Sequence, residues 1–444
     1  MSDTWLRMTA ADLGRGIGAG EIDPLDLAKT YLKAIADHPL RDRIYVRVTE
    51  ARALAEAKAA SDRARSGHRL SALDGVPISW KDLFDTAGIA TESGSALLRG
   101  RTPERDAVVL QNATAAGLVC LGKTHMSELA FSGLGYNPIT ASPPSVNDPD
   151  GVAGGSSSGA ATSVAFGLAA AGIGSDTGGS VRVPSVWNDL VGLKTTSGRL
   201  SLEGVVPLAA SFDTVGPLCR SVEDAALLLA ALEGAKSAAD LAGASMGGVR
   251  LLIPSNEIFE NVREQPLAGF NSAVQRLQLA GATVDGQPIA CIEPALKLSP
   301  ILFATEAYGT WKDQIEAAPE KMFHEILERF RAGGSFSGAD FVQAWQQLRH
   351  LRTEWAKATA SYDAVILPTT PSLPPKIARL ASDHDYYVTE NLLALNNTRI
   401  GNLMGLASMT LPTGLPSTGI MFLTSPNSEE RLLRLAAAAE AALA

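Results

Sequence analysis

The chain contains 444 residues, 46% of them hydrophobic, and carries a formal net charge of −9. This length and composition allow a large buried core and exclude global disorder, and a negative charge without long single-sign runs excludes the basic footprint of a nucleic-acid-binding protein. The N-terminus lacks a basic start followed by an apolar run, and the longest bland apolar stretch, residues 160–173, is too short and too rich in Ala and Gly to span a bilayer.

The three cysteines, Cys120, Cys219 and Cys291, lie in separate stretches without a CxxC pair. An odd and sparse count argues against a disulfide framework. We therefore expect reduced thiols in a cytoplasmic protein that does not associate with membranes.

The first part of the chain is predicted to be helical. Asp23 is a suitable N-cap with Pro24 at the first helical position, and the apolar residues of 25–37 recur at helical spacing. Residues 50–64 are rich in strong helix formers and predict a second helix.

Beyond these helices, short β-rich segments alternate with helical ones, which indicates α/β layers around a largely buried sheet. The predicted strands include 75–80, 116–123 and 249–254, and the predicted helices include 221–234 and 270–281.

The chain changes character between about residues 238 and 360, where the amphipathic helices 306–318, 320–333 and 339–358 are predicted. Core α/β sequence resumes at 362–375. We therefore divide a single domain, 1–444, into N-terminal helices (1–66), a core with the candidate catalytic residues (67–237), a mainly helical insertion (238–360) and a C-terminal return to the core (361–444).

Two loops rich in Ser and Gly are candidates for chemistry: "GGSSSG" from Gly154 and "GSDTGGSVRVP" from Gly174. Neither is followed by the lysine that a phosphate-binding P-loop requires. An aspartic protease needs two Asp-Thr-Gly-type loops, and the only partner for Asp176, Asp213, is too close in sequence to lie in a second lobe.

"GSSSG" also matches the GxSxG nucleophile elbow, with Ser157 as the candidate nucleophile. An elbow requires a strand directly before it and a later histidine. The preceding residues are rich in Pro and Gly and cannot form a central strand, and the later histidines lie in the predicted insertion or in a charged loop.

Each loop alone is better explained by tight turns and helix caps than by chemistry. Lys81 changes this balance, because it follows a short predicted strand and would be held by a rigid element at the mouth of the sheet. A buried, neutral lysine can act as the base of a serine hydrolase that lacks a usable histidine.

Together these segments resemble the amidase signature family. The resemblance rests on "GVPISWKDLFDTAG" around Lys81, the two Ser/Gly loops, and the sequence that begins "LVGLKTTSGRL" at Leu190. Ser156 and Ser180 also have the family's separation of 24 residues between its two catalytic serines. The resemblance covers most of the chain outside the first helices and the insertion.

The resemblance implies a three-layer α/β/α fold with a central, mostly parallel mixed sheet covered by helices on both faces. It assigns Ser180 as nucleophile, Ser156 as bridging serine after a cis peptide bond from Gly155, and Lys81 as base. The backbone N–H groups of Thr177, Gly178, Gly179 and Ser180 would form the oxyanion hole, where a bare backbone can approach the developing charge. No metal or organic cofactor is implied.

Other residues of these motifs are expected to be structural: Asp176 and Arg182 should pair with the backbone or with each other, and Asp213 should order a turn. Met126, Phe131 and Trp187 are candidates for the acyl pocket, although apolar side chains near loops equally fit an ordinary core.

We therefore expect an amidase that cleaves a small primary or aryl carboxamide, with a homodimer as the family-level expectation. The alternative is the ammonia-producing subunit of an amidotransferase complex. The sequence after Gly122 argues against this alternative, because it differs from the Asn-Met-Asp-Glu-Phe-Ala-Met motif expected in that subunit. A catalytically silent interaction protein is disfavoured by the intact Lys-Ser-Ser set.

Overall fold

A computed structural model describes residues 2–235 and 237–444. Its largest feature is an 11-stranded sheet in the order β1-β3-β2-β6-β8-β7-β12-β13-β11-β9-β10. These strands are β1 (Tyr45–Val48), β2 (Pro77–Lys81), β3 (Val119–Thr124), β6 (Ala171–Asp176), β7 (Val191–Lys194), β8 (Thr214–Cys219), β9 (Arg250–Pro254), β10 (Thr283–Gln287), β11 (Ala364–Pro368), β12 (Ala407–Pro412) and β13 (Gly419–Thr424). A small separate sheet pairs β4 (Pro144–Ser145) with β5 (Asp148–Val152).

The large sheet is mixed, as predicted, although antiparallel pairings outnumber the parallel ones between its strands. Its parallel pairings fall in two runs, β3-β2-β6 and β11-β9-β10, and antiparallel pairings join these runs through β8, β7, β12 and β13. β1 adds a further antiparallel strand at one edge. Lys81 ends β2 and Ser180 follows β6, both strands of the first parallel run, whereas Ser156 follows β5 of the small sheet.

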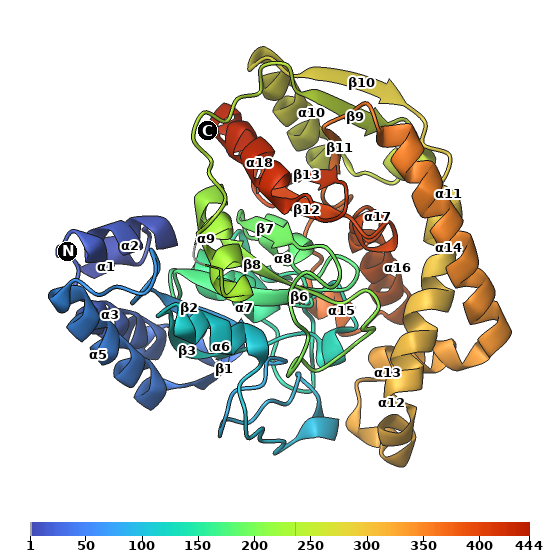
Figure 1. Cartoon of the computed structure of the whole chain (residues 1–444). Helices are drawn as coiled ribbons and strands as arrows, with labels where there is room; N and C mark the ends of the chain where they lie inside the picture. The colour runs from blue at the N-terminus through green and yellow to red at the C-terminus, as the bar shows by residue number, and fades with distance from the viewer. Residues whose placement is uncertain (1, 236) are drawn as a thin grey trace.

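Helices cover both faces of this sheet (Figure 1). They are α1 (Ser2–Trp5), α2 (Ala10–Gly18), α3 (Pro24–Asp37), α4 (Arg41–Ile44), α5 (Glu50–Ser66), α6 (Val108–Ala115), α7 (Ser158–Ala165), α8 (Arg182–Trp187), α9 (Val222–Glu233), α10 (Glu264–Leu279), α11 (Ile292–Ser299), α12 (Thr305–Ala317), α13 (His324–Ala332), α14 (Gly338–Thr359), α15 (Ile377–Leu380), α16 (His384–Ala394), α17 (Thr398–Leu403) and α18 (Glu429–Leu443). The three-layer α/β/α architecture is therefore confirmed.

The layers can be followed through contacts between elements. Helices α6, α9, α18 and α10 contact one another in that order along one face, whereas α7 and α8 contact each other and the same central strands from the opposite face. Side chains of the sheet and of the layer with α6, α9, α18 and α10 belong to one large apolar core, in which Trp80, Ile173 and Leu193 are inaccessible to solvent, whereas α7 and α8 contribute to two smaller apolar clusters.

Several helix ends lie where the sequence predicts them, and one start does not. The Asp23 carboxylate accepts a hydrogen bond from Leu25 N at 2.9 Å, as an N-cap of α3 should. Helix α9 ends at Gly234, whose φ of 70° is a left-handed conformation that favours glycine. Helix α10 begins six residues earlier than predicted, because Pro266 lies in its first turn, where a missing N–H costs no hydrogen bond.

Residues 238–360 contain the helices α10–α14 and also the strands β9 and β10, which extend the sheet at its far edge (Figure 1). This segment packs against the core near the candidate site. The ring of Phe212 stacks on Trp345 with centroids 5.0 Å apart and meets Phe303 edge-on at 4.4 Å. The proposed subdivision of the chain at 66, 237 and 360 stays a prediction.

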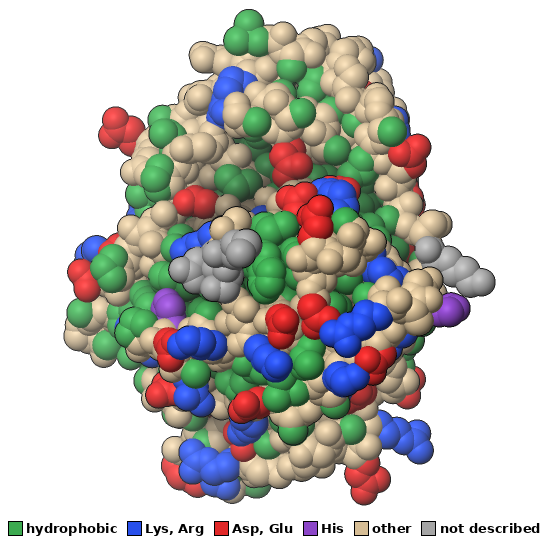
Figure 2. Space-filling view, turned by 90° about the vertical axis from the view of Figure 1, so that its left-hand side faces the viewer, with side chains coloured by type: hydrophobic (Ala, Val, Ile, Leu, Met, Phe, Trp, Pro, Cys, Tyr) green, Lys and Arg blue, Asp and Glu red, His purple; other side chains and the backbone are tan. Residues whose placement is uncertain are grey.

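Two further features concern membrane-spanning helices and the distribution of surface charge. Within the described residues, no helix is both long and apolar enough to cross a membrane. On the face shown in Figure 2, acidic and basic side chains lie next to one another, so this face has no continuous basic area.

Candidate active site

Lys81 is the last residue of β2 and is completely buried. Its Nζ donates to Ser156 Oγ at 2.6 Å and to Ser175 Oγ at 2.8 Å. Burial lowers the pKa of Lys81 to about 7, against the opposing influence of the Asp176 and Asp213 carboxylates. A substantial fraction of this amine is therefore neutral near pH 7, which is the protonation state that a general base needs.

Ser156 lies in the loop between β5 and α7, and its peptide bond with Gly155 is cis, as the resemblance implied. No side chain fits at Gly155, because a Cβ there would lie 2.5 Å from Gly135 N. The next residue, Ser157, donates its backbone N–H to the Ser180 carbonyl at 3.3 Å. The two Ser/Gly loops are thus joined directly beside the two candidate serines.

Ser157, the candidate of the nucleophile elbow, has a different environment. Its hydroxyl is buried and donates to the Ser175 carbonyl at 3.2 Å. The preceding strand, β5, belongs to the small two-stranded sheet and not to the central one. Neither feature fits an exposed nucleophile on a sharp turn from a central strand.

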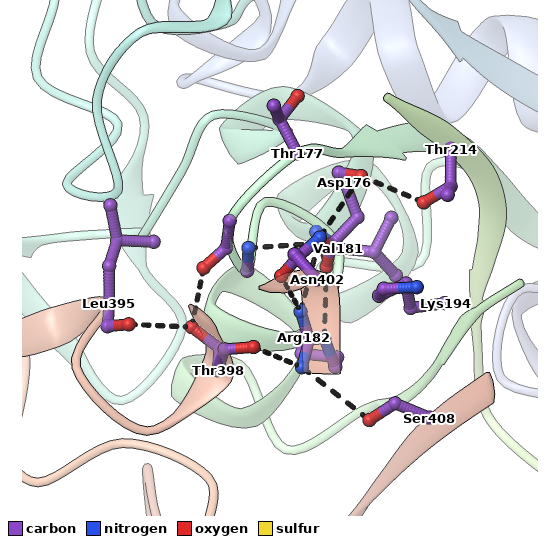
Figure 3. A network of polar contacts seen from close by, with 12 residues as sticks. Asp176, Thr177, Val181, Arg182, Lys194, Thr214, Leu395, Thr398, Asn402 and Ser408 are labelled. Carbon is purple, nitrogen blue, oxygen red and sulfur yellow. Dashed lines mark hydrogen bonds and ion pairs between the residues drawn. The ribbon is translucent and has the colours of Figure 1, made fainter. Parts of the chain in front are cut away.

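Ser180 lies in the loop between β6 and α8, and it is 4% exposed. Its hydroxyl makes no hydrogen bond to a described residue, so it is free to meet a ligand. Figure 3 shows the network that holds this loop, centred on the ion pair between Asp176 and Arg182. Although burial raises the pKa of the Asp176 carboxyl, the Arg182 guanidinium holds it well below its usual range.

The expected structural roles of the acidic residues are confirmed. Asp176 pairs with Arg182 and accepts hydrogen bonds from the backbone N–H groups of Gly179 at 2.8 Å and Val181 at 3.1 Å. Asp213 accepts from Leu208 N at 2.9 Å and Ala209 N at 3.2 Å, which orders a turn, and its carboxylate also accepts from the Thr177 hydroxyl.

The placement of Gly179 differs from the expectation for the oxyanion hole. Because its N–H donates to Asp176, it is engaged in holding the loop. Its φ is +138°, and a Cβ there would lie 2.1 Å from Thr398 Oγ1. The candidate oxyanion donors that remain are the backbone N–H groups of Thr177, Gly178 and Ser180.

A small pocket adjoins Ser180; a water-sized sphere fits in about 20 Å³ of it, and the space reaches about 330 Å³ only when the part open to solvent is included. Of the three apolar residues predicted to form an acyl pocket, Phe131 lines it. Met126 and Trp187 are fully buried outside this lining, and the Trp187 indole N–H donates to Ser372 O at 3.1 Å. The lining residues are Ala130, Phe131, Ser132, Thr177, Gly178, Ser180, Leu208, Phe303, Arg329, Leu395 and Arg399.

Sequence reasoning missed three polar residues of this site. Ser175, a second partner of the Lys81 amine, lies within a motif that had been singled out. Arg329 and Arg399 lie on α13 and α17, far from Ser180 in the sequence, and an arginine on a helix carries no signal that distinguishes a pocket from the surface. No group of three or more His, Cys, Asp or Glu side chains able to hold a metal occurs among residues 2–235 and 237–444.

Comparison with known proteins shows which family the chain belongs to. The Amidase family model matches residues 26–433. The chain is 33% identical to 2-amino-5-chloromuconic acid deaminase of Comamonas testosteroni, with 88% of this chain and 86% of the relative covered. It is 31% identical to a glutamyl-tRNA(Gln) amidotransferase subunit from Myxococcus xanthus, with 98% and 96% covered.

The solved structures agree with this result. A crystal structure of an amidase superimposes with a TM-score of 0.88 at 28% identity, covering 98% of this chain and all of the other. The chain therefore belongs to the amidase family, in its amidase-signature form. It is a hydrolase that acts on the C–N bonds of linear amides.

Proposed function

We propose that the chain hydrolyses a small carboxamide through an acyl-enzyme, with Ser180 as nucleophile, Ser156 as proton relay and Lys81 as base. The observation that carries this proposal is the 2.6 Å contact between Lys81 Nζ and Ser156 Oγ in a fully buried setting. Ser180 lies at the adjoining pocket, where a substrate carbonyl can reach it.

The protonation states follow from the contacts. A neutral Lys81 amine has two N–H bonds and one lone pair, so it can donate to Ser175 while accepting the Ser156 proton. Ser156 then takes the proton of the Ser180 hydroxyl as that oxygen attacks the amide carbon. The proton ends on Lys81, and the negative charge ends on the former carbonyl oxygen.

The same groups carry the reaction forward. We assign the backbone N–H groups of Thr177, Gly178 and Ser180 as donors to the developing oxyanion, because fixed donors of this kind stabilise a tetrahedral intermediate. When the C–N bond breaks, the proton returns from Lys81 through Ser156 to the leaving nitrogen, which departs as ammonia or an amine. Water then attacks the acyl-enzyme by the same relay.

A panel of primary and aryl amides tests this proposal, with released ammonia or amine as the readout. Ser180→Ala should abolish turnover, whereas Ser157→Ala, a neighbouring buried serine outside the relay, should retain most of it. Turnover by Ser180→Ala at the wild-type rate would overturn the proposed nucleophile.

A second candidate function is the production of ammonia from glutamine within an amidotransferase. It is favoured by the similarity to the glutamyl-tRNA(Gln) amidotransferase subunit over nearly the whole chain. Glutaminase activity that appears only with partner subunits would support it, and amide hydrolysis by the isolated chain supports the first proposal. A cytoplasmic location and a homodimeric state stay predictions, the first in keeping with three free, buried cysteines.

A further inference from the structure

Two arginine side chains reach the pocket beside Ser180 from different helices. Arg399 extends from α17 and Arg329 from α13, and both line the same pocket as Ser180 and Phe131. Because both line one pocket, the charge of Arg329 disfavours the charged form of Arg399. Two cations thus converge on one small space.

Arg399 has no partner for its charge among the described residues. The side chain is only 9% exposed, and its Nη2 is buried without a hydrogen bond. Its guanidinium donates to no described side chain or carbonyl. An unpaired buried charge is costly, so folded proteins normally pair it.

Arg329 likewise makes no ion pair with a carboxylate of the residues that the structure describes. Its Nη1 donates to the Phe131 carbonyl at 3.0 Å, and its guanidinium lies over the Phe131 ring, 4.3 Å from the centroid. These contacts orient the guanidinium but leave its charge uncompensated. No acidic residue is among those that line the pocket.

Arg182, the buried arginine of the loop network, shows how this protein pairs a buried positive charge. Arg182 is buried, as Arg399 largely is, but it makes an ion pair with Asp176 at 2.9 Å and donates to Asn402 Oδ1 at 2.6 Å. The comparison indicates that the missing partner of Arg399 is supplied from outside the chain. Burial and Arg329 lower the pKa of Arg399 to about 9, so it still carries its charge at neutral pH.

We infer that the substrate is an amide that also bears a carboxylate, held by Arg399 with Arg329 beside it while the scissile carbonyl faces Ser180. The inference rests on the proposed function, because the position of the scissile group is set by Ser180. A planar guanidinium matches a carboxylate through paired N–H donors.

The same pocket disfavours an amino acid amide. An α-ammonium group would enter a space with two uncompensated arginines and no lining carboxylate, since Asp213 lies behind Thr177 and accepts from its hydroxyl. The substrate class that fits is therefore a monoamide of a dicarboxylic acid without a free amino group, in preference to glutamine.

Matched substrates test the inference through kcat/KM. Succinamate is compared with 4-oxopentanamide, in which a methyl ketone replaces the carboxylate, and with glutamine. The wild type should prefer succinamate over the ketone by roughly 10- to 150-fold, the range expected for charge-assisted hydrogen bonds. Arg399→Gln should remove this preference by slowing succinamate alone, and Arg399→Lys should restore part of it.

Binding is measured separately from chemistry. In the Ser180→Ala background, calorimetry should detect succinamate binding that is lost in Ser180→Ala/Arg399→Gln and retained with Arg276→Gln. Arg276 is a matched control, since it is a part-buried arginine on α10 that donates to the Leu443 carbonyl at 2.8 Å, away from this pocket. The unfolding temperature of unliganded Arg399→Gln should not fall, because the substitution removes an unpaired buried charge.

The outcomes separate the two proposals. Equal kcat/KM for succinamate and its ketone counterpart, or equal losses for both in Arg399→Gln, would overturn the carboxylate inference while leaving Ser180 as nucleophile. A wild-type preference for glutamine over succinamate would also overturn it. Unchanged turnover in Ser180→Ala would instead overturn the proposed function, and the calorimetric result would still report on the arginines.

Discussion

Arg182 and Asp176 face each other across the loop that carries Ser180. Their Nη2 and Oδ1 atoms are 2.9 Å apart, Nε and Oδ2 are 3.0 Å apart, and both side chains are inaccessible to solvent. The same carboxylate holds the N–H groups of Gly179 and Val181 on either side of Ser180. The ion pair therefore fixes the backbone that presents Ser180, the proposed nucleophile.

Breaking this pair from one side should be strongly destabilising. Arg182→Met leaves the Asp176 charge buried and unpaired, and we expect a loss of about 3–5 kcal/mol in the free energy of unfolding. Urea denaturation measures it, with Arg434→Met on the exposed face of α18 as control. A loss as small as that of the control would show that the pair does not hold the loop.

The two neighbouring glycines of the loop should respond differently to alanine. At Gly179 the new Cβ would lie 2.1 Å from Thr398 Oγ1, and φ is already +138°, so Gly179→Ala should lower both the unfolding temperature and activity. At Gly178 the nearest atom to a Cβ is Arg399 Cγ at 3.7 Å, so Gly178→Ala should keep the wild-type unfolding temperature. Equal effects on stability would contradict the loop geometry.

The two serines that contact Lys81 should contribute unequally. Ser156→Ala removes the proton relay and should lower kcat by roughly 10²–10⁴-fold, the usual contribution of general acid–base catalysis. Ser175→Ala removes only a hydrogen-bond partner of the amine and should cost much less. Steady-state kinetics on one amide compares them, and a larger loss for Ser175→Ala would reverse the assigned roles.

The pH dependence of hydrolysis should report on Lys81. If the neutral Lys81 amine is the base, as proposed, its pKa of about 7 means that kcat/KM should rise with pH through a midpoint near 7 and fall away at lower pH. Burial also brings the pKa of Lys194 and of Glu128 to about 7, so Lys194→Met and Glu128→Gln serve as controls. Loss of the midpoint in either control would assign the titration to that residue.

Sequence predicts the framework of this protein better than its pocket. The strand ending at Lys81 and the helices α3, α9 and α14 follow from local signals: β-rich residues, N-caps and apolar periodicity. The Ser/Gly loops stand out in the sequence because short runs made almost entirely of Gly and Ser are rare. The short strand β10 was not predicted, since its residues, "TVDGQ", alternate only weakly.

The pocket depends on contacts that no local pattern encodes. Arg399 and Arg329 resemble surface residues of helices in the sequence, and only the packing of α17 and α13 brings them beside Ser180. Met126 and Trp187 show the opposite error. They were predicted as pocket residues because they are apolar and lie near loops, but in the fold they are core residues. The engagement of the Gly179 N–H by Asp176 likewise depends on the folded loop.

Labelling with a fluorophosphonate, which reacts with activated serines, tests the central claim most directly when the modified peptide is mapped by mass spectrometry. The Lys81–Ser156–Ser180 assignment predicts a label on Ser180 in the wild type and a labelling rate lowered by roughly 10²-fold or more in Lys81→Met, which lacks the base. A label on Ser157, or Ser180 labelling at an unchanged rate in Lys81→Met, would contradict it.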